Sequence, residues 1–424
     1  EIEEWRSSKA FELMLTGQRY YESEADILKR KRMIIGPDGV QIEAKNIANN
    51  KLEHGFIRKL VDQKVGSLLS LPMSIQTNNG CYQELLNGYF DKSFLRMFQN
   101  LGKDAINNGK AWLHVYYNED GELSFKRMPS EEIIPLWRDS DHTQLDAVIR
   151  VYDIEVFEGT KKATITKVEF WDLKGVKRYI LSEGELVPDV EAGDTDSHFV
   201  AVGADGEEAY NWQRVPFICF KYNNEEIPLI KFIKSLVDDY DVKKSDNSNN
   251  LEDLPNSIYV LKNYDGSDLG EFRMDSNRKD IYEFGRGVDT QSERFGGDRS
   301  GIALKFLYAD LDLDANMIEA EFQASLEQLR WFIDQHIYNT TGKDYSGENV
   351  DFIFNRDVII NETDAISNAK SSVGIISDET LVANHPWVTN TQDELERLEA
   401  QRAEEFGDFE GYPALGGAPG GEGE

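Results

Sequence analysis

The apolar positions in the first hundred residues follow the spacing of a helix. Helical spacing is visible around Phe11 and Leu15 and again from Tyr20 to Leu28. Between positions 50 and 71 the apolar residues fall near one stripe, which Pro72 ends: Leu52, Phe56, Leu60, Val65 and Leu68. In a second stretch, Leu85, Tyr89, Phe94 and Phe98 repeat at helical intervals, and Asn107-Asn108-Gly109 ends the pattern. The chain is therefore predicted to begin with helices.

From residue 111 the pattern changes to alternation, which is typical of strands. Residues 111–116 and 123–126 flank the turn Asn118-Glu119-Asp120-Gly121 and predict a hairpin. Further strands are predicted over 147–156, 163–171, 176–181 and 215–221. Helices followed by a sheet predict an α+β domain in the first half of the chain.

The second half returns to helical spacing. Residues 226–242 form an amphipathic pattern, and a polar stretch at 243–250 leads to a small β unit with strands over 257–261 and 279–284. The pattern over 302–338 is apolar on nearly every side, so this long helix must be buried within one subunit or between subunits. A strand over 350–354 and three short helices, starting near Asn361, Ser377 and Thr391, complete the prediction.

The chain is strongly acidic, with a formal net charge of -32. Such a surface repels phosphate and argues against a sequence-reading DNA-binding protein. Two cysteines, Cys81 and Cys219, cannot supply a disulfide framework or a zinc ligand set, and we interpret them as buried, reduced thiols of a cytosolic protein. No apolar run approaches a membrane span, and because the chain opens with Glu1 rather than Met we expect its true start to be missing.

Two patterns resemble ligand sites and lack an essential residue. The acidic run Asp310, Asp312, Asp314 and Asn316, with Glu321, mimics a calcium loop, but Ala315 replaces the required glycine inside a helical pattern. A solvated acidic turn or a helix kink is the preferred interpretation. Thr341-Gly342-Lys343 has no upstream glycine, and Asp344 replaces the magnesium-binding Ser or Thr of a phosphate loop.

The sequence indicates no active site. The six histidines are scattered without metal-ligand spacing, so no metal, cofactor or catalytic residue is predicted. Carboxylates are numerous, and no spacing singles out a catalytic pair. The preferred prediction is a protein that is not an enzyme, and an acidic, metal-dependent nuclease stays open as the alternative.

Residues 215–226, Val-Pro-Phe-Ile-Cys-Phe-Lys-Tyr-Asn-Asn-Glu-Glu, resemble the segment that enters the stem of phage portal proteins. The resemblance is to the portal branch of siphophages of Gram-positive hosts. It continues in the same order through residues 258–266, 307–317 and 384–387, and residues 51–72 look like the family's early helix. No single motif is specific, whereas the ordered set is.

This resemblance implies a structural head–tail connector rather than an enzyme. The family forms a dodecameric ring with a wing, a stem, a clip and a crown around a DNA channel used for genome packaging and ejection. Implied partners are further copies of the chain, double-stranded DNA passing without sequence specificity, terminase, the major capsid or scaffolding protein and a head-completion adaptor. The expected location is the capsid vertex of the virion, and the host cytoplasm during assembly, with no membrane. The alternative is an acidic metal-dependent phage nuclease or another head-associated enzyme.

The resemblance also implies boundaries. They are a wing over 1–224 with the strand 350–354 returning to it, a stem helix over 225–243, a clip over 244–290, a tunnel loop over 291–301, a long helix over 302–341, a helical crown over 361–410 and a disordered acidic, Gly-rich tail over 411–424. The family has a second stem helix between the clip and the tunnel loop, and the sequence around Thr290 and Gln291 leaves no room for it. We therefore expect residues to be missing between these two positions.

Three groups of site residues follow. The tunnel-loop candidates are Arg294, Gly296, Gly297, Asp298 and Arg299. The two glycines allow backbone freedom, and the two arginines are the segment's only cations. An ordinary helix-entry loop is the competing interpretation. The subunit-interface candidates lie on the long apolar helix: Phe322, Leu326, Leu329 and Phe332. The candidates for docking an adaptor on the clip are Tyr259, Lys262, Tyr264 and Tyr282.

Overall fold

The computed structural model describes most of the chain. It covers residues 1–158, 161–192, 196–203, 206–253, 269–291, 301–356, 362–383, 385, 387–388 and 391–407. The chain divides into two compact units, the first formed by residues 1–295 and 307–357 and the second by residues 296–306 and 358–424. Helices and antiparallel sheets in the first unit confirm the predicted α+β class.

The N-terminal helices begin at polar caps. They are α1 (Ile2–Arg6), α2 (Lys9–Tyr21), the 3-10 turn η1 (Asp26–Lys29), α3 (Phe56–Leu69), α4 (Gly80–Tyr89) and α5 (Lys92–Asn108). The Asp91 carboxylate accepts the Phe94 N–H at 2.8 Å and so caps α5. Gly109 ends α5 with a φ of +84°, and a Cβ at this position would lie 2.2 Å from the Glu226 carbonyl oxygen. Only glycine fits there.

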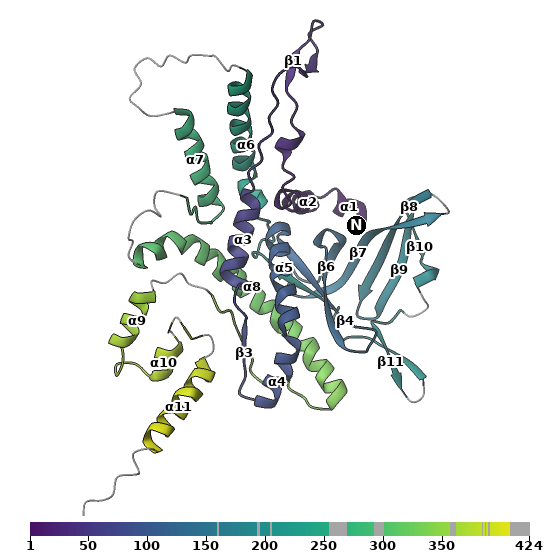
Figure 1. The fold of residues 1–424 in the computed structure, drawn as a ribbon. Helices are drawn as coiled ribbons and strands as arrows, with labels where there is room; N and C mark the ends of the chain where they lie inside the picture. The colour runs from purple at the N-terminus through teal and green to yellow at the C-terminus, as the bar shows by residue number, and fades with distance from the viewer. Residues whose placement is uncertain are drawn as a thin grey trace, which may run out of the picture. The chain divides into compact units, whose positions relative to one another are not determined.

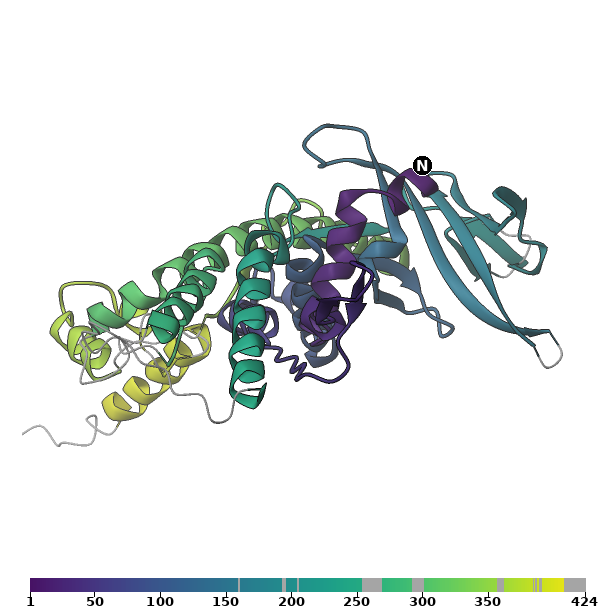
Figure 2. The ribbon, with the colours of Figure 1, turned by 90° about the horizontal axis from the view of Figure 1, so that it is seen from above.

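Two antiparallel sheets follow α5. The three-stranded sheet has the order β13-β4-β5 and consists of β4 (Lys110–Tyr117), β5 (Leu123–Met128) and β13 (Phe217–Lys221). After η2 (Ser130–Glu132), the five-stranded sheet has the order β10-β9-β8-β7-β6 and consists of β6 (Ile133–Trp137), β7 (Leu145–Glu158), β8 (Lys161–Asp172), β9 (Gly175–Ser182) and β10 (Glu185–Pro188). The long β7–β8 hairpin extends away from α6 and α7 in both views (Figure 1, Figure 2), and α1 packs beside it. These strands confirm the predicted hairpin and sheet.

Three short pairs complete the strands of the first unit. They are β1 (Met33–Ile35) with β2 (Gln41–Glu43), β11 (Phe199–Gly203), which follows the 3-10 turn η3 (Val190–Ala192), with β12 (Gly206–Tyr210), and β3 (Ser74–Gln76) with β14 (Asp351–Ile353). In the last pair Phe352 lies opposite Ile75, so the strand predicted over 350–354 does return to the N-terminal region.

β13 is followed by the helices α6 (Ile230–Asp253), α7 (Leu269–Phe284) and α8 (Gly301–Thr341). The strand predicted over 279–284 is wrong, because these residues belong to α7. Two adjacent residues, Ile281 and Tyr282, are both buried, which suits a helix and not an alternating strand. The predicted end of the stem helix at 243 is also wrong, since α6 continues to Asp253. The other predicted strand, 257–261, lies outside the described residues.

α7 runs antiparallel to α6 and packs against it (Figure 1). Asn277 of α7 and Asp239 of α6 form a hydrogen bond between the two helices. A second helix therefore does follow the segment 254–268. Its supposed absence was the reason for expecting lost residues between Thr290 and Gln291, and that reason no longer holds.

The main hydrophobic core joins both halves of the chain. The ring of Phe98 in α5 lies 5.7 Å from that of Phe220 in β13 and 5.5 Å from that of Phe322 in α8, measured between centroids. Phe354 packs on the same ring at 6.1 Å. The core thus fixes α8 against the sheet β13-β4-β5 and the N-terminal helices.

The second unit contains the three predicted C-terminal helices, α9 (Glu362–Ser371), α10 (Asp378–Ala383) and α11 (Thr391–Gly407). Ser377 caps α10 by accepting the Thr380 N–H at 3.3 Å. Arg402 of α11 pairs with Asp378 at 2.9 Å. The tail predicted over 411–424 lies outside the described residues.

Candidate functional site

An extended segment, residues 48–54, is bound along one side of α6, and we call it the strap. Four side chains of α6, each four residues from the next, accept backbone N–H groups from every second residue of the strap. The bonds, with donor–acceptor distances of 3.1, 2.9, 2.6 and 2.8 Å, join Asp241 to His54, Ser245 to Leu52, Asn249 to Asn50 and Asp253 to Ala48. The first three acceptors are at most 1% exposed. The strap therefore holds α6 along half of its length.

This ladder explains why α3 begins at Phe56 and not at residue 50. The strap residues satisfy their backbone donors with α6 side chains, so they do not need a helix to do so. Asp241 also contacts the His54 ring, with 2.8 Å between Oδ1 and Nδ1, and burial raises the pKa of its carboxyl.

A buried ion pair fixes α8 to α3 beside the end of α7. The Lys64 ammonium of α3 lies 2.6 Å from the Asp314 carboxylate of α8, and Lys64 is 1% exposed. Tyr222, just after β13, donates its hydroxyl to the same carboxylate at 2.8 Å. Arg286, two residues after α7, reaches Asp314 at 3.3 Å, and its carbonyl accepts from Lys64 at 3.2 Å. We call these four residues the hub.

Electrostatic interactions couple the groups of the hub. Burial lowers the pKa of Lys64, while the neighbouring Asp314 charge opposes that effect. Burial and the Asp314 carboxylate raise the pKa of Tyr222 well above its ordinary value. Each group is satisfied only while α3, α8 and the turn after α7 keep their relative positions. The hub therefore ties α3 and α8 to each other, to Tyr222 and to the turn that follows α7.

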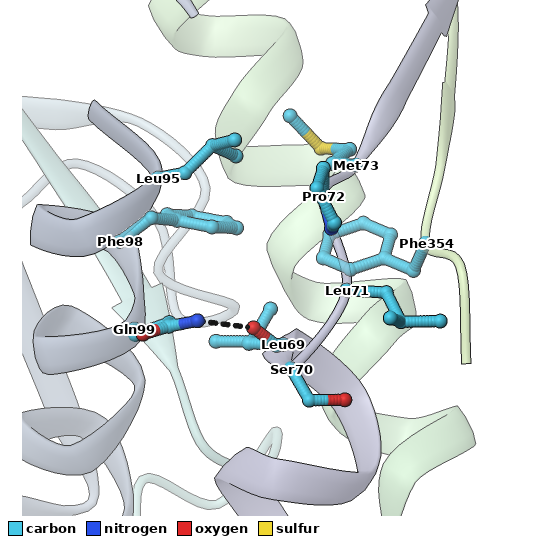
Figure 3. Close-up of a pocket in the computed structure, with 9 residues that line it drawn as sticks. All are labelled: Leu69, Ser70, Leu71, Pro72, Met73, Leu95, Phe98, Gln99 and Phe354. Atoms are coloured by element: carbon cyan, nitrogen blue, oxygen red, sulfur yellow. Dashed lines mark hydrogen bonds between the residues drawn. The ribbon is translucent and has the colours of Figure 1, made fainter. Parts of the chain in front are cut away.

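Two hollows lie on the surface of the first unit, in the part that the structure describes. The smaller, about 70 Å³, lies where α3 ends against α5, between Leu69, Pro72, Phe98 and Phe354, and the Gln99 amide donates to the Leu69 carbonyl at 2.8 Å beside it (Figure 3). The larger, about 510 Å³, is an open polar groove between α2, α5 and the turn after β5. The first is too small for an ordinary ligand.

The perturbed ionisable groups have structural partners. Burial lowers the pKa of His114 to about 4, and its ring bonds the Pro216 carbonyl at 2.9 Å. Burial raises the pKa of the Cys219 thiol to about 12, so it is unreactive. Cys81, in contrast, is exposed, which corrects its expected burial. In the part of the chain that the structure describes, no cluster of His, Cys, Asp or Glu is arranged to hold a metal ion, and no helix is long and apolar enough to cross a membrane.

Comparison with known proteins identifies the family. The model of the phage portal protein family described as SPP1 Gp6-like matches residues 7–278 and 271–407. The chain belongs to this family. A portal protein of Bacillus phage SPP1 is 30% identical over 427 residues, covering 92% of this chain and 84% of the relative. A portal protein of Clostridium phage phiCD119 is 28% identical over 439 residues, covering 91% of each chain.

For this portal chain the interface candidates on α8 need correction. Phe322, Leu326, Leu329 and Phe332 are at most 2% exposed, and all belong to the main core of their own chain. The apolar pattern of α8 is therefore explained by packing within one subunit. Side chains exposed on the same helix include Leu313, which is 51% exposed.

The remaining candidates divide into two groups. Tyr282 is 5% exposed and packs against Phe56 and under Lys59, so it is not available for docking an adaptor. Eight candidates lie outside the described residues: Arg294, Gly296, Gly297, Asp298, Arg299, Tyr259, Lys262 and Tyr264. They stay predictions.

The calcium-like run of the portal chain lies within the continuous helix α8, which agrees with the interpretation against calcium. The expectation of a solvated acidic turn is wrong for Asp314, which is 3% exposed and belongs to the hub. Sequence reasoning missed both the hub and the ladder. The signal for the ladder was the spacing of Asp241, Ser245, Asn249 and Asp253, four residues apart along one helix face.

Proposed function

We propose that this portal chain is one subunit of a closed ring of twelve copies. The ring surrounds a channel for double-stranded DNA at the capsid vertex, which serves genome packaging and ejection. The observation that carries the proposal is the antiparallel pair α6–α7, braced by the strap along α6 and by the hub at its base. Such a braced pair suits a stem that must keep its shape while DNA moves past it.

We take the boundaries of the proposed parts from the helices and strands of the structure, in place of those that the resemblance implied. We assign residues 1–224 and β14 to the wing, α6 and α7 to the stem and α9 to α11 to the crown. The clip shrinks to residues 254–268, between the two stem helices, and the tunnel loop to residues 292–300, before α8. A channel lined with fixed cations would neutralise phosphates and hold DNA in place. The net charge of -32 supports a conduit, because an acidic surface lets DNA pass without such binding.

The clip and its surroundings are the proposed docking site for terminase and for a head-completion adaptor. The tunnel loop is proposed to line the narrowest part of the channel, with Arg294 and Arg299 as the cations that meet phosphate. Replacing Gly296 and Gly297 with Val should leave rings intact and reduce the DNA packaged per particle. Normal packaging by such rings would refute the loop's role, and so would a failure to form rings.

Electron microscopy and mass measurement of the purified protein test the ring directly. We expect closed rings whose mass is a multiple of the chain mass, with an axial opening. A monodisperse monomer would contradict the proposal. Incubation of the same preparation with linear DNA and Mg²⁺ tests the alternative, because cleavage that tracks the protein through purification would favour a nuclease.

A further inference from the structure

The β1–β2 hairpin exposes apolar side chains on both of its faces. Ile34 and Ile42 lie opposite each other on one face and are 43% and 46% exposed. Met33 and Ile35 point to the other face, where Ile35 is 77% exposed. Val40 at the turn is 64% exposed. A two-stranded hairpin is marginally stable alone in water, so apolar residues on both faces indicate that something covers it.

The hairpin has a fixed position. Arg32, next to β1, pairs with Asp253 at the end of α6 at 2.6 Å, and Arg30 pairs with Asp246 at 2.9 Å. Figure 1 shows the hairpin projecting past the C-terminal end of α6. Leu251, on the last turn of α6, is itself 65% exposed. The apolar hairpin therefore stands on a rigid base beside the proposed stem.

The base of the hairpin is basic in an acidic chain. Residues 29–32 read Lys-Arg-Lys-Arg, whereas the whole chain carries a formal charge of -32. The two arginines pair with α6, and Lys31 lies 3.6 Å from Glu43. Lys29 and Lys45 are exposed on the same base. Complementary charge across an interface favours a partner with an acidic surface.

We propose that this hairpin docks on a neighbouring copy of the same chain. This inference rests on the proposed ring. In a ring each interface joins two different patches, so one subunit can offer the hairpin and the next an acidic surface. Copies that each carry -32 repel one another, and the exposed cations Lys29 and Lys45 at the base of the hairpin lower that repulsion where they meet the neighbour.

A photo-crosslinker at Ile35 tests the docking. Rings are purified with p-benzoylphenylalanine at Ile35, irradiated, denatured and separated by mass, and the linked peptides are identified. The matched control carries the same group at Val190, an 88% exposed residue of η3. We expect covalent chain dimers from position 35, at least fivefold more than from position 190. Links only within one chain, for example to residues 254–268, or no links in intact rings, would overturn the inference, as would links solely to another head protein in particles.

A second set of variants separates docking from folding. Ile35→Asp with Ile42→Asp should leave the circular dichroism spectrum of the chain unchanged, because the hairpin lies outside the hydrophobic core. It should also lower the fraction of chain in rings at fixed concentration at least tenfold, whereas Val190→Asp should not. Unchanged ring formation by the double variant would overturn the inference alone. A wild-type chain that forms no rings would instead overturn the proposed function.

Discussion

Replacing Lys64 with methionine removes one charge of the hub and keeps most of the side-chain volume. The Asp314 carboxylate then stays buried with the Tyr222 hydroxyl and, at 3.3 Å, the partly exposed Arg286. A buried charge that has lost its main partner has no water to replace it. The fold should therefore lose stability, although no hydrophobic contact of comparable size disappears.

The magnitude follows from the geometry. At the observed 2.6 Å separation and an effective dielectric constant of about 20, the attraction is about 6 kcal/mol. Desolvation of the two ions costs several kcal/mol each, so the intact pair contributes little net stability. Breaking it by removing one partner typically costs about 3–5 kcal/mol. Because Arg286 partly compensates Asp314, we expect Lys64→Met to fall near 3 kcal/mol, at the lower end of that range.

Urea unfolding followed by tryptophan fluorescence measures this loss, at one protein concentration for all variants. Asp314→Asn should leave the buried Lys64 ammonium without its partner and so destabilise the fold, and its cost should shrink as the pH rises, because burial lowers the pKa of Lys64. The double variant should cost about 2 kcal/mol less than the sum of the two single variants. Strictly additive losses, or a neutral Lys64→Met, would refute the assignment of the hub as a coupled buried pair.

Three further predictions concern the folded subunit. Gly109→Ala should destabilise by about 2 kcal/mol or more, because the added Cβ meets the Glu226 carbonyl, whereas Gly121→Ala, at φ +78° in open space, should cost only about 1 kcal/mol by the same urea assay. Burial lowers the pKa of His114 to about 4 from an unfolded value near 6.5, so the unfolded chain binds a proton first as the pH falls. The free energy of unfolding should therefore drop by about 2 kcal/mol between pH 7 and pH 5, and His114→Gln should remove that part of the pH dependence. Phe322→Asp should abolish soluble folded protein, and circular dichroism of a well-folded, unassembled variant would contradict its place in the core.

Much of the fold was predictable because long periodic segments carry their own signal. The strands around Gly121 and the helix α8 were found because a side-chain period of two or of about 3.6 persists over many residues. The segment 279–284 misled because six residues are too few to separate the two periods. Helix α6 was cut short at 243 because its outer half carries polar residues on the buried side as well. Those residues bind the strap, and their partners are nearly two hundred positions away in sequence.

The site was less predictable than the fold. A pattern of apolar residues shows that a helix is buried and not which chain covers it, so Phe322 was assigned to an interface between subunits when its own core covers it. Asp314 looked like a ligand in an acidic run, since nothing near it in sequence reveals that Lys64 lies opposite. Pairings between distant residues are fixed by the packed structure, and the local sequence around either residue does not identify its partner.

The strap has a mechanical consequence for α6. Four helical residues rise about 6.0 Å and turn about 40° past a full circle, while two extended residues advance about 6.6 Å. Over the three intervals of the ladder the bonded chain must therefore wind about 120° around the helix. A helix gripped along such a winding line cannot spin about its own axis without dragging the strap lengthwise. In a helical bundle, a helix can rotate about its axis against its neighbours. The rotation of α6 is instead fixed by the strap, the segment that leads into α3.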